Sequence, residues 1–152
     1  KWQKIASAMN SKRIGIMAVQ ETHLTLERTR NLNKKFHKQM YIINSSAPLN
    51  PSTTAGVAIV INRRLVNYRP GDLKYKELVP GRALQVNIPW KNHTATLNFL
   101  AIYAPNDEKQ NEELWSDLNR QYQDYTVPER PHFVLGDFNI RAFHGRSDFG
   151  PT

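Results

Sequence analysis

The sequence contains no cysteine among its 152 residues, and this absence excludes disulfide bonds, thiolate metal centres and cysteine nucleophiles. It also has no long apolar run: stretches such as IGIMAV and GVAIVI fall far short of the ~18 residues that a membrane-spanning helix needs. Residues 1–10 lack the apolar core of a signal peptide. We therefore expect an intracellular protein with no membrane partner. The first residue is not methionine, so we expect the chain to begin inside a longer protein.

Acidic residues are scarce relative to basic ones. Thirteen Asp and Glu stand against twenty-one Lys and Arg, which gives a formal net charge of +8 and a pI near 9.9. This excess favours polyanionic partners, nucleic acid first and anionic membrane surfaces second. Charge alone leaves open a soluble protein that happens to be basic. The composition, 39% hydrophobic and 22% charged, is that of a globular domain large enough to bury a core.

Apolar spacing predicts the elements of the first half of the chain. A first helix is predicted by the spacing of Trp2, Ile5, Ala6 and Met9. The apolar run at residues 14–20 is typical of a strand buried on both faces. Thr25 is a suitable N-cap for a second helix that turns Leu32 and Phe36 toward the core. We then expect a strand over 41–46, a loop over 47–55 and a strand over 56–66.

The second half predicts a hairpin, a helix and a last strand. Residues 82–90 and 94–105 form the hairpin, and Asp107 with Gln110 has capping-box spacing. The helical face that follows is lined by Leu114, Leu118, Tyr122 and Tyr125. The last strand is HFVLGDFN, after two prolines that end the helix. Hairpins mixed with helical crossovers predict an α/β or α+β layered sandwich, as one domain or part of one.

Three predicted strands end in polar residues. These are Glu21, Thr22 and His23 after the first strand, Tyr103 and Asn106 on the second, and Asp137 and Asn139 on the third. In open α/β sheets, binding sites collect beyond the carboxyl ends of strands, so the three groups can converge. Each group taken alone also fits a helix cap, an Asx turn or a packing aromatic.

The chemistry of these groups points to phosphate. Two carboxylates and amide oxygens, without cysteine, suit Mg²⁺ rather than Zn²⁺. A carboxylate held by an amide can orient or deprotonate a water for attack on phosphorus. A tyrosine hydroxyl and an asparagine amide can donate to phosphate oxygens whose charge grows in the transition state. The pattern therefore indicates phosphodiester hydrolysis.

Five segments carry a family resemblance, in order along the chain: AVQETHL, GVAIVIN, PGRALQV, LAIYAPND and VLGDFNI. With them the sequence resembles the endonuclease/exonuclease/phosphatase superfamily, which includes deoxyribonuclease I. It is most similar to the endonuclease domains of LINE-type retroelements. The resemblance implies a deoxyribonuclease I-like fold of mixed sheets flanked by helices and a Mg²⁺-dependent DNA endonuclease, with Mn²⁺ as a substitute. It further implies fusion to a reverse transcriptase and a nuclear location if the target is chromosomal DNA.

The resemblance also assigns roles to single residues. Glu21 is implied as the metal ligand, and Asp137 as the residue that positions or activates water, supported by Asn139. Tyr103 and Asn106 are implied to hold the scissile phosphate. Arg82 is implied as a contact to the DNA backbone, with a surface arginine beside a turn as the alternative. His23 stands beside the metal glutamate but does not match the catalytic histidine of the family.

Two departures from the family weigh against turnover. The family opens with a strand that carries an asparagine near the metal and closes with an Asp-His pair, and we expect residues 1–152 to be a partial domain that lacks both. None of His37, His93, His132 and His144 has the context to replace that histidine. Residues 148–150 spell a kinase motif, DFG, without the accompanying kinase segments. An inactive or truncated relic that only binds nucleic acid is therefore the alternative. A phosphatase or sphingomyelinase is a third reading, which the positive charge disfavours.

Overall fold

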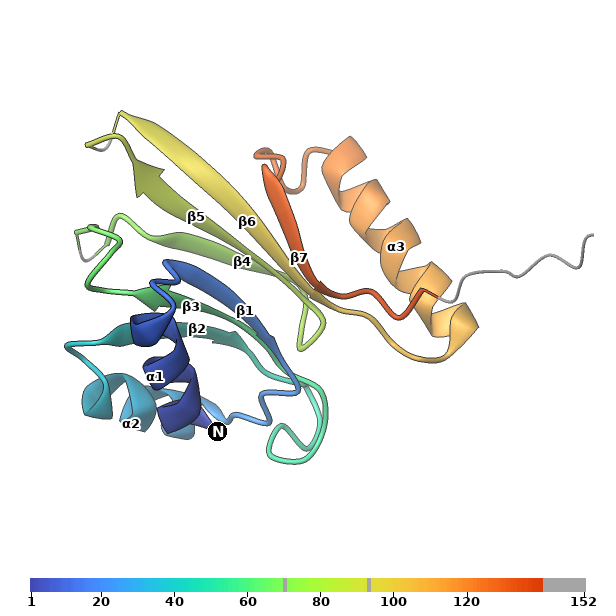
Figure 1. The fold of residues 1–152 in the computed structure, drawn as a ribbon. Helices are drawn as coiled ribbons and strands as arrows, with labels where there is room; N and C mark the ends of the chain where they lie inside the picture. Colours follow the sequence, from blue (N-terminus) through green and yellow to red (C-terminus); the bar gives the residue numbers. More distant parts are fainter. Residues whose placement is uncertain (70, 93, 141–152) are drawn as a thin grey trace, which may run out of the picture.

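The computed structural model describes residues 1–69, 71–92 and 94–140, and Figure 1 shows their arrangement in two β-sheets with helices outside them. The elements in chain order are α1 (Trp2–Ser11), β1 (Ile16–Gln20), α2 (Leu26–Lys35), β2 (Met40–Ser45), β3 (Val57–Asn62), β4 (Lys74–Val79), β5 (Ala83–Trp90), β6 (Ala95–Tyr103), α3 (Glu108–Gln123) and β7 (Phe133–Asp137). The residues 148–150, His93 and His144 of the sequence analysis lie outside the described ranges.

Sheet A has the strand order β1-β3-β2, with both pairs antiparallel. The central strand β3 is buried along its whole length, as its run of Val, Ala and Ile residues predicts. The expectation that the run at 14–20 is buried on both faces was wrong. In β1 only Val19 is fully buried, because among the described strands β1 pairs with β3 alone and forms an edge of the sheet.

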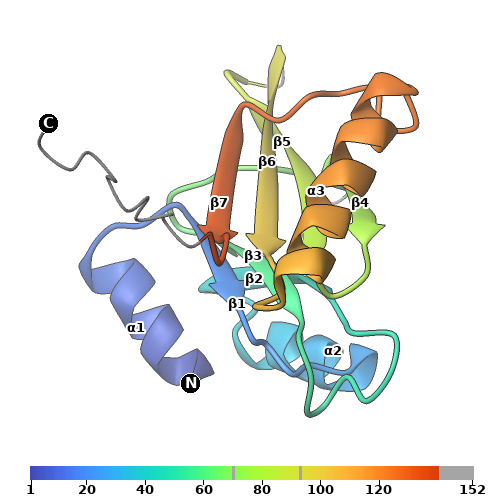
Figure 2. The ribbon, with the colours of Figure 1, turned by 90° about the vertical axis from the view of Figure 1, so that its right-hand side faces the viewer.

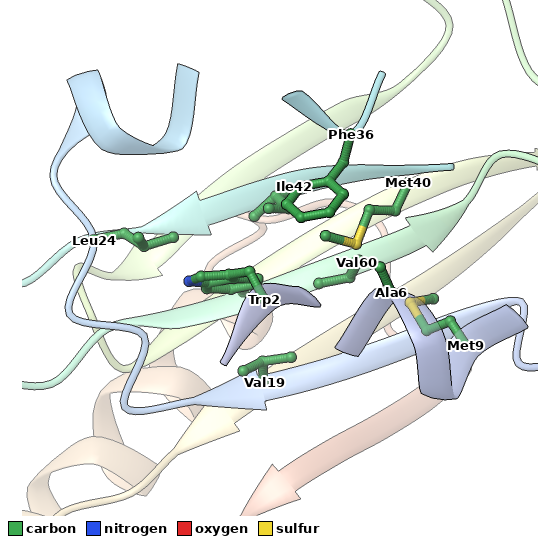
Figure 3. Packing of buried hydrophobic residues seen from close by; sticks show 10 residues of the cluster. Trp2, Ala6, Met9, Val19, Leu24, Phe36, Met40, Ile42 and Val60 are labelled. Carbon is green, nitrogen blue, oxygen red and sulfur yellow. The ribbon is translucent and has the colours of Figure 1, made fainter. Parts of the chain in front are cut away.

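Helices α1 and α2 cover the outer face of sheet A. Trp2, Ala6 and Met9 project from α1 onto the sheet, where they meet Val19 and Val60, as Figure 3 shows. Helix α2 begins at the predicted cap, since the Thr25 side chain accepts a hydrogen bond from the Arg28 amide. The helical spacing read from the sequence thus builds the first layer of the core.

Sheet B has the strand order β4-β5-β6-β7. The predicted hairpin forms β5 and β6, and α3 carries the chain to β7, which pairs parallel to β6. The Asp107 side chain caps α3 by accepting from the Gln110 amide, as predicted. Tyr125 does not line the buried helical face: the helix ends at Gln123 and Tyr125 is 77% exposed, while Val127 fills the core.

The two sheets pack face to face, and α3 covers the outer face of sheet B, as Figure 2 shows. Between the sheets, Ile59 and Ile61 of β3 meet Val86 and Ile88 of β5 within one apolar cluster. Adjacent apolar layers of this kind confirm the predicted α/β layered sandwich. In the described parts of the chain, no helix has the length and hydropathy to cross a membrane.

The strand predicted over residues 56–66 is shorter in the structure, because Asn62 ends it. The Asn62 side-chain amide donates to the carbonyls of Met9 and Ile14, and its oxygen accepts from the Arg64 amide. These bonds hold the end of β3 against the end of α1 and turn the following residues out of the sheet.

Candidate active site at the strand ends

Gly136 brings β7 close to β6 immediately before Asp137. Its φ angle is +142°, and a Cβ atom built there would lie 1.9 Å from the Ile102 carbonyl oxygen. No side chain fits at that distance, so the strand can reach its last register pair, Tyr103 with Asp137, only with glycine at position 136. The glycine inside an otherwise apolar strand therefore serves to place the aspartate.

The residues after β7 form a tight turn on Asp137. The Asn139 amide donates to Asp137 Oδ1 at 3.0 Å, which is the Asx turn that the sequence offered as one reading of Gly-Asp-x-Asn. The Asn139 side chain also donates to the Ala104 carbonyl at 2.6 Å. The turn therefore fixes the Asp137 carboxylate and ties it to the end of β6.

Asn111 is a positioning residue that the sequence analysis missed. Its side-chain amide donates to the Pro105 carbonyl at 2.9 Å and to the Phe138 carbonyl at 3.0 Å. It thereby joins α3 to two of the loops that carry predicted site residues, those after β6 and β7. A signal was present, because Asn111 lies three residues before Leu114 and so shares the buried face of the helix.

A strained loop presents Glu21 after β1. Both Glu21 and His23 have left-handed backbones, with φ angles of +49° and +51°, which non-glycine residues adopt at a cost. Between them Thr22 is only 4% exposed, and its hydroxyl donates to Asn44 Oδ1 at 2.7 Å. Gly56 packs against it, since a Cβ there would lie 2.2 Å from the Thr22 hydroxyl oxygen. Thr22 is thus an anchor, and the anchored loop holds Glu21 out to solvent.

A direct contact joins the two sheets at this rim. The Tyr103 hydroxyl of β6 donates to Glu21 Oε1 at 2.8 Å, although the two residues come from different sheets. Asp137 is the register partner of Tyr103 on the neighbouring strand, and β1 also contacts β7. The structure therefore brings three of the predicted site residues to one end of the sandwich. In Figure 2 the arrowheads of β6 and β7 point to this end.

Burial and the neighbouring Glu21 carboxylate raise the pKa of Tyr103 and so favour its protonated form. Burial raises the pKa of Tyr103, and the hydrogen bond and negative charge of Glu21 raise it further, against a smaller lowering by Arg82. The Arg82 guanidinium carbon lies 4.7 Å from the centre of the Tyr103 ring, and Arg82 Nη1 donates to the Tyr103 carbonyl at 3.3 Å. Arg82 therefore packs on the Tyr103 ring as a stacked cation. The predicted contact of Arg82 with DNA stays a prediction, as does the role of the exposed Asn106.

The donor atoms at the rim are carboxylate oxygens, the ligand type that Mg²⁺ takes in proteins. Within residues 1–69, 71–92 and 94–140, no three or more His, Cys, Asp or Glu side chains gather closely enough to hold a metal ion. A structural zinc site needs such a group. Mg²⁺ instead keeps several waters and takes one or two carboxylates together with substrate phosphates, which is what Glu21 and Asp137 offer. The Lys1 ammonium also lies at this loop, where it donates to the Glu21 backbone carbonyl at 2.5 Å.

A mixed sandwich with carboxylates at its strand ends defines the class of this protein. A sequence model of the Endonuclease/Exonuclease/phosphatase family matches residues 3–152, and the chain belongs to that family.

Solved structures share the fold over nearly the whole chain. The endonuclease domain of TRAS1, a telomere-specific non-LTR retrotransposon, matches with a TM-score of 0.58 and 16% identity over 92% of this chain and 53% of that one. Danio rerio TDP2 complexed with single-strand DNA product matches with a TM-score of 0.59 and 14% identity over 93% and 54%. The mannosyl-6-phosphatase Bt3783 of Bacteroides thetaiotaomicron matches with a TM-score of 0.63 and 12% identity over 95% and 58%. The chain thus spans between half and three fifths of the length of these structures.

Proposed function

We propose that this chain carries part of a Mg²⁺-dependent phosphodiesterase site that acts on DNA, within the endonuclease domain of a retroelement-like protein. The observation that carries the proposal is the contact of Tyr103 with Glu21 across the two sheets, beside Asp137 on the next strand. Strand ends from two sheets thereby offer two carboxylates and a phenol at one rim. The likeness to the TRAS1 endonuclease domain and the net charge of +8 favour DNA over small phosphates.

Each side chain has a task in this proposal. The Asp137 carboxylate, fixed by the Asn139 amide, orients the attacking water and accepts its proton. The Tyr103 hydroxyl donates a hydrogen bond to Glu21, and the raised pKa of Tyr103 keeps this hydroxyl protonated. When substrate binds, the same hydroxyl can donate to a phosphate oxygen in place of the Glu21 carboxylate. Glu21 would hold Mg²⁺, which supplies charge stabilisation at the phosphate when bound. Asn106 and Arg82 stand at the same rim as candidate phosphate contacts.

The second candidate is nucleic-acid binding without turnover. It is favoured by the small donor set of the described rim, which brings two carboxylates and a phenol together without a histidine partner.

We propose that residues 1–152 are a partial domain and that a first strand and a C-terminal segment with an Asp-His pair belong to the longer protein, next to a reverse transcriptase. A location in the nucleus follows if that protein acts on chromosomal DNA.

The test is nicking of supercoiled plasmid in Mg²⁺ by this chain and by a version extended at both ends. Asp137→Ala and Glu21→Gln are the site variants, and Asp124→Ala, at the far end of α3, is the matched control for loss of a carboxylate. Loss of one group that acts in the transition state commonly costs on the order of 10²–10³ in rate. We expect weak nicking by the short chain, stronger nicking by the extended one, and losses of that size in both site variants.

The outcomes separate the candidates. DNA binding without nicking in either version would support the binding-only alternative and overturn the enzyme. Nicking that survives Asp137→Ala would place the chemistry elsewhere. Release of phosphate from a phosphosugar monoester, without plasmid nicking, would favour the phosphatase reading over the nuclease.

A further inference from the structure

The end of the sandwich opposite the candidate site carries a dense group of basic side chains. At this end β3 stops, β1 and β2 begin, and β5 turns into β6, as Figure 1 shows on its left-hand side. Six exposed side chains on the connections there are called the basic end: Lys12, Arg13, Lys38, Arg63, Arg64 and Lys91. They come from four separate connections, so the fold and not a single charge run brings them together.

Two arginines of the basic end are held in place by neutral acceptors. Arg63 Nη1 donates to the His37 carbonyl at 2.8 Å, and Arg64 Nη1 donates to Asn10 Oδ1 at 3.0 Å. A carbonyl or an amide positions a guanidinium without cancelling its charge, unlike a carboxylate. Within the described ranges, none of the six cations of the basic end forms an ion pair. Their positive charges are therefore not neutralised by a direct ion pair.

The charge of the chain is divided in space. Residues 1–100 hold sixteen Lys and Arg against four Asp and Glu, whereas residues 101–140 hold three against eight. The second group lies mainly on α3 and its flanks. Asp72 is the one carboxylate on the described parts of the connections that form the basic end. Glu129 lies near the outer face of sheet B, where its carbonyl accepts from Gln85. A polyanion is thus repelled by α3 and attracted to the basic end.

A hollow of about 380 Å³ opens at the basic end, between the connection after β3 and the β5–β6 hairpin. The residues that line it include the apolar Leu65 and Trp90 and the polar Asn67 and Lys91. Trp90 is 48% exposed, so part of this large aromatic residue is accessible to a ligand. Lys91 and Asn92 have left-handed backbones, with φ of +49° and +53°, as is common in the turn of a β-hairpin, and Lys91 thus lies in the turn between β5 and β6. The hollow offers a planar apolar wall beside hydrogen-bonding groups.

We propose that the basic end binds single-stranded nucleic acid, with phosphates on Arg63, Arg64 and Lys91 and one base stacked on Trp90. Phosphates match the exposed cations, and a base has the flat apolar face that the indole can cover. A single strand fits better than a duplex, because its bases are free to leave the stack and enter a hollow. This inference goes beyond the proposed function, since the surface lies at the other end from Glu21 and Asp137. One molecule can then hold a strand while its strand-end site is free.

The test is fluorescence anisotropy with fluorescein-labelled RNA and DNA strands of one sequence and with the matching DNA duplex. The triple variant Arg63→Gln, Arg64→Gln and Lys91→Gln removes three charges from the basic end. The control Arg28→Gln, Arg30→Gln and Lys109→Gln removes three exposed charges elsewhere. We expect at least a ~10-fold loss of single-strand affinity in the first set, and a fall of about 2 in the slope of log K against log salt. The control set should lose less than about threefold, because it changes only the net charge.

Trp90→Ala tests the stacking, with Tyr75→Ala as a control that removes a 60% exposed aromatic from the same sheet. We expect Trp90→Ala to weaken single-strand binding about tenfold and Tyr75→Ala to leave it unchanged. Melting temperatures verify that each variant is folded. Equal losses in both charge sets, a preference for duplex, or equal losses in Trp90→Ala and Tyr75→Ala would each overturn the proposal. Tighter binding of RNA than of DNA would support it and identify RNA as the strand.

Discussion

Replacing Gly136 by alanine should separate the last residues of β7 from β6. The new Cβ would lie 1.9 Å from the Ile102 carbonyl oxygen and 2.8 Å from its carbonyl carbon, both of which are backbone atoms that no rotamer change can move. The backbone angle of +142° adds strain for any side chain. Together the strain and the overpacking should cost about 2–6 kcal/mol. That is a large share of the ~5–15 kcal/mol that a domain of ordinary stability has in total.

The cheapest response of the protein is to give up the last register pairs, Ile102 with Gly136 and Tyr103 with Asp137. Asp137 would then leave the rim while the remaining strands stay paired. We therefore expect Gly136→Ala to reduce DNA nicking by the extended protein by at least ~10²-fold, a loss typical for one misplaced catalytic group.

Gly71→Ala is the matched control for this prediction. Gly71 also has a positive φ angle, +91°, but nothing lies within 4 Å of a Cβ built there. Gly71→Ala should be destabilised only by the backbone strain, by about 1–2 kcal/mol, and it should keep its nicking activity. Urea unfolding followed by tryptophan fluorescence measures both variants. Equal losses of stability in the two, or normal activity in Gly136→Ala, would refute the argument from the close approach of the strands.

Three further outcomes follow from single contacts. Tyr103→Phe should lower the free energy of unfolding by about 1 kcal/mol, because it removes the hydroxyl that donates to Glu21, and urea unfolding measures this loss. Asp107→Ala should cost about 1 kcal/mol through loss of the cap on α3, whereas Asp107→Asn, which keeps a capping oxygen, should cost much less. Burial raises the pKa of Tyr122 to about 12, so the unfolded chain loses this proton at a lower pH than the folded chain does. The stability that the buried, protonated Tyr122 contributes below pH 10 should therefore be lost as the pH rises toward 12. Tyr122→Phe should show a smaller fall than the natural chain in urea midpoints taken between pH 9 and 12.

Much of the fold could be predicted because its elements follow local rules. The caps at Thr25 and Asp107 and the apolar face of α1 depend on residues only a few positions apart. The errors arose where distant contacts decide the outcome. Asn62 ends β3 through bonds to Met9 and Ile14, some fifty residues away, and spacing along the chain carries no sign of them.

The candidate site divides in the same way. The polar strand ends were visible in the sequence because side chains such as Asp137 interrupt apolar runs. The residues that hold the site in place could not be recognised in the sequence. Thr22, which the sequence groups with Glu21, is a buried anchor on Asn44, and Asn111 clamps two loops from a helix that looks merely amphipathic. A hydrogen bond between segments far apart in sequence leaves no pattern in either segment, so such residues are found only once the fold is known.

The placement of the site explains why its geometry depends on the whole core. Glu21 directly follows β1 of sheet A, and Tyr103 and Asp137 belong to sheet B, so the spacing between the carboxylates depends on how the two sheets pack. The packing residues Ile59 and Val86 lie in that layer, far from any substrate. A change that shifts one sheet against the other by an ångström would therefore lengthen the contact of Tyr103 with Glu21 without touching either residue. Ile59→Val should leave a small cavity and cost about 0.5–1.5 kcal/mol. If its effect on nicking is much larger than that loss of stability implies, the sheets act as the positioning frame of the site; if activity and stability fall together, the strand ends are held by their own loops.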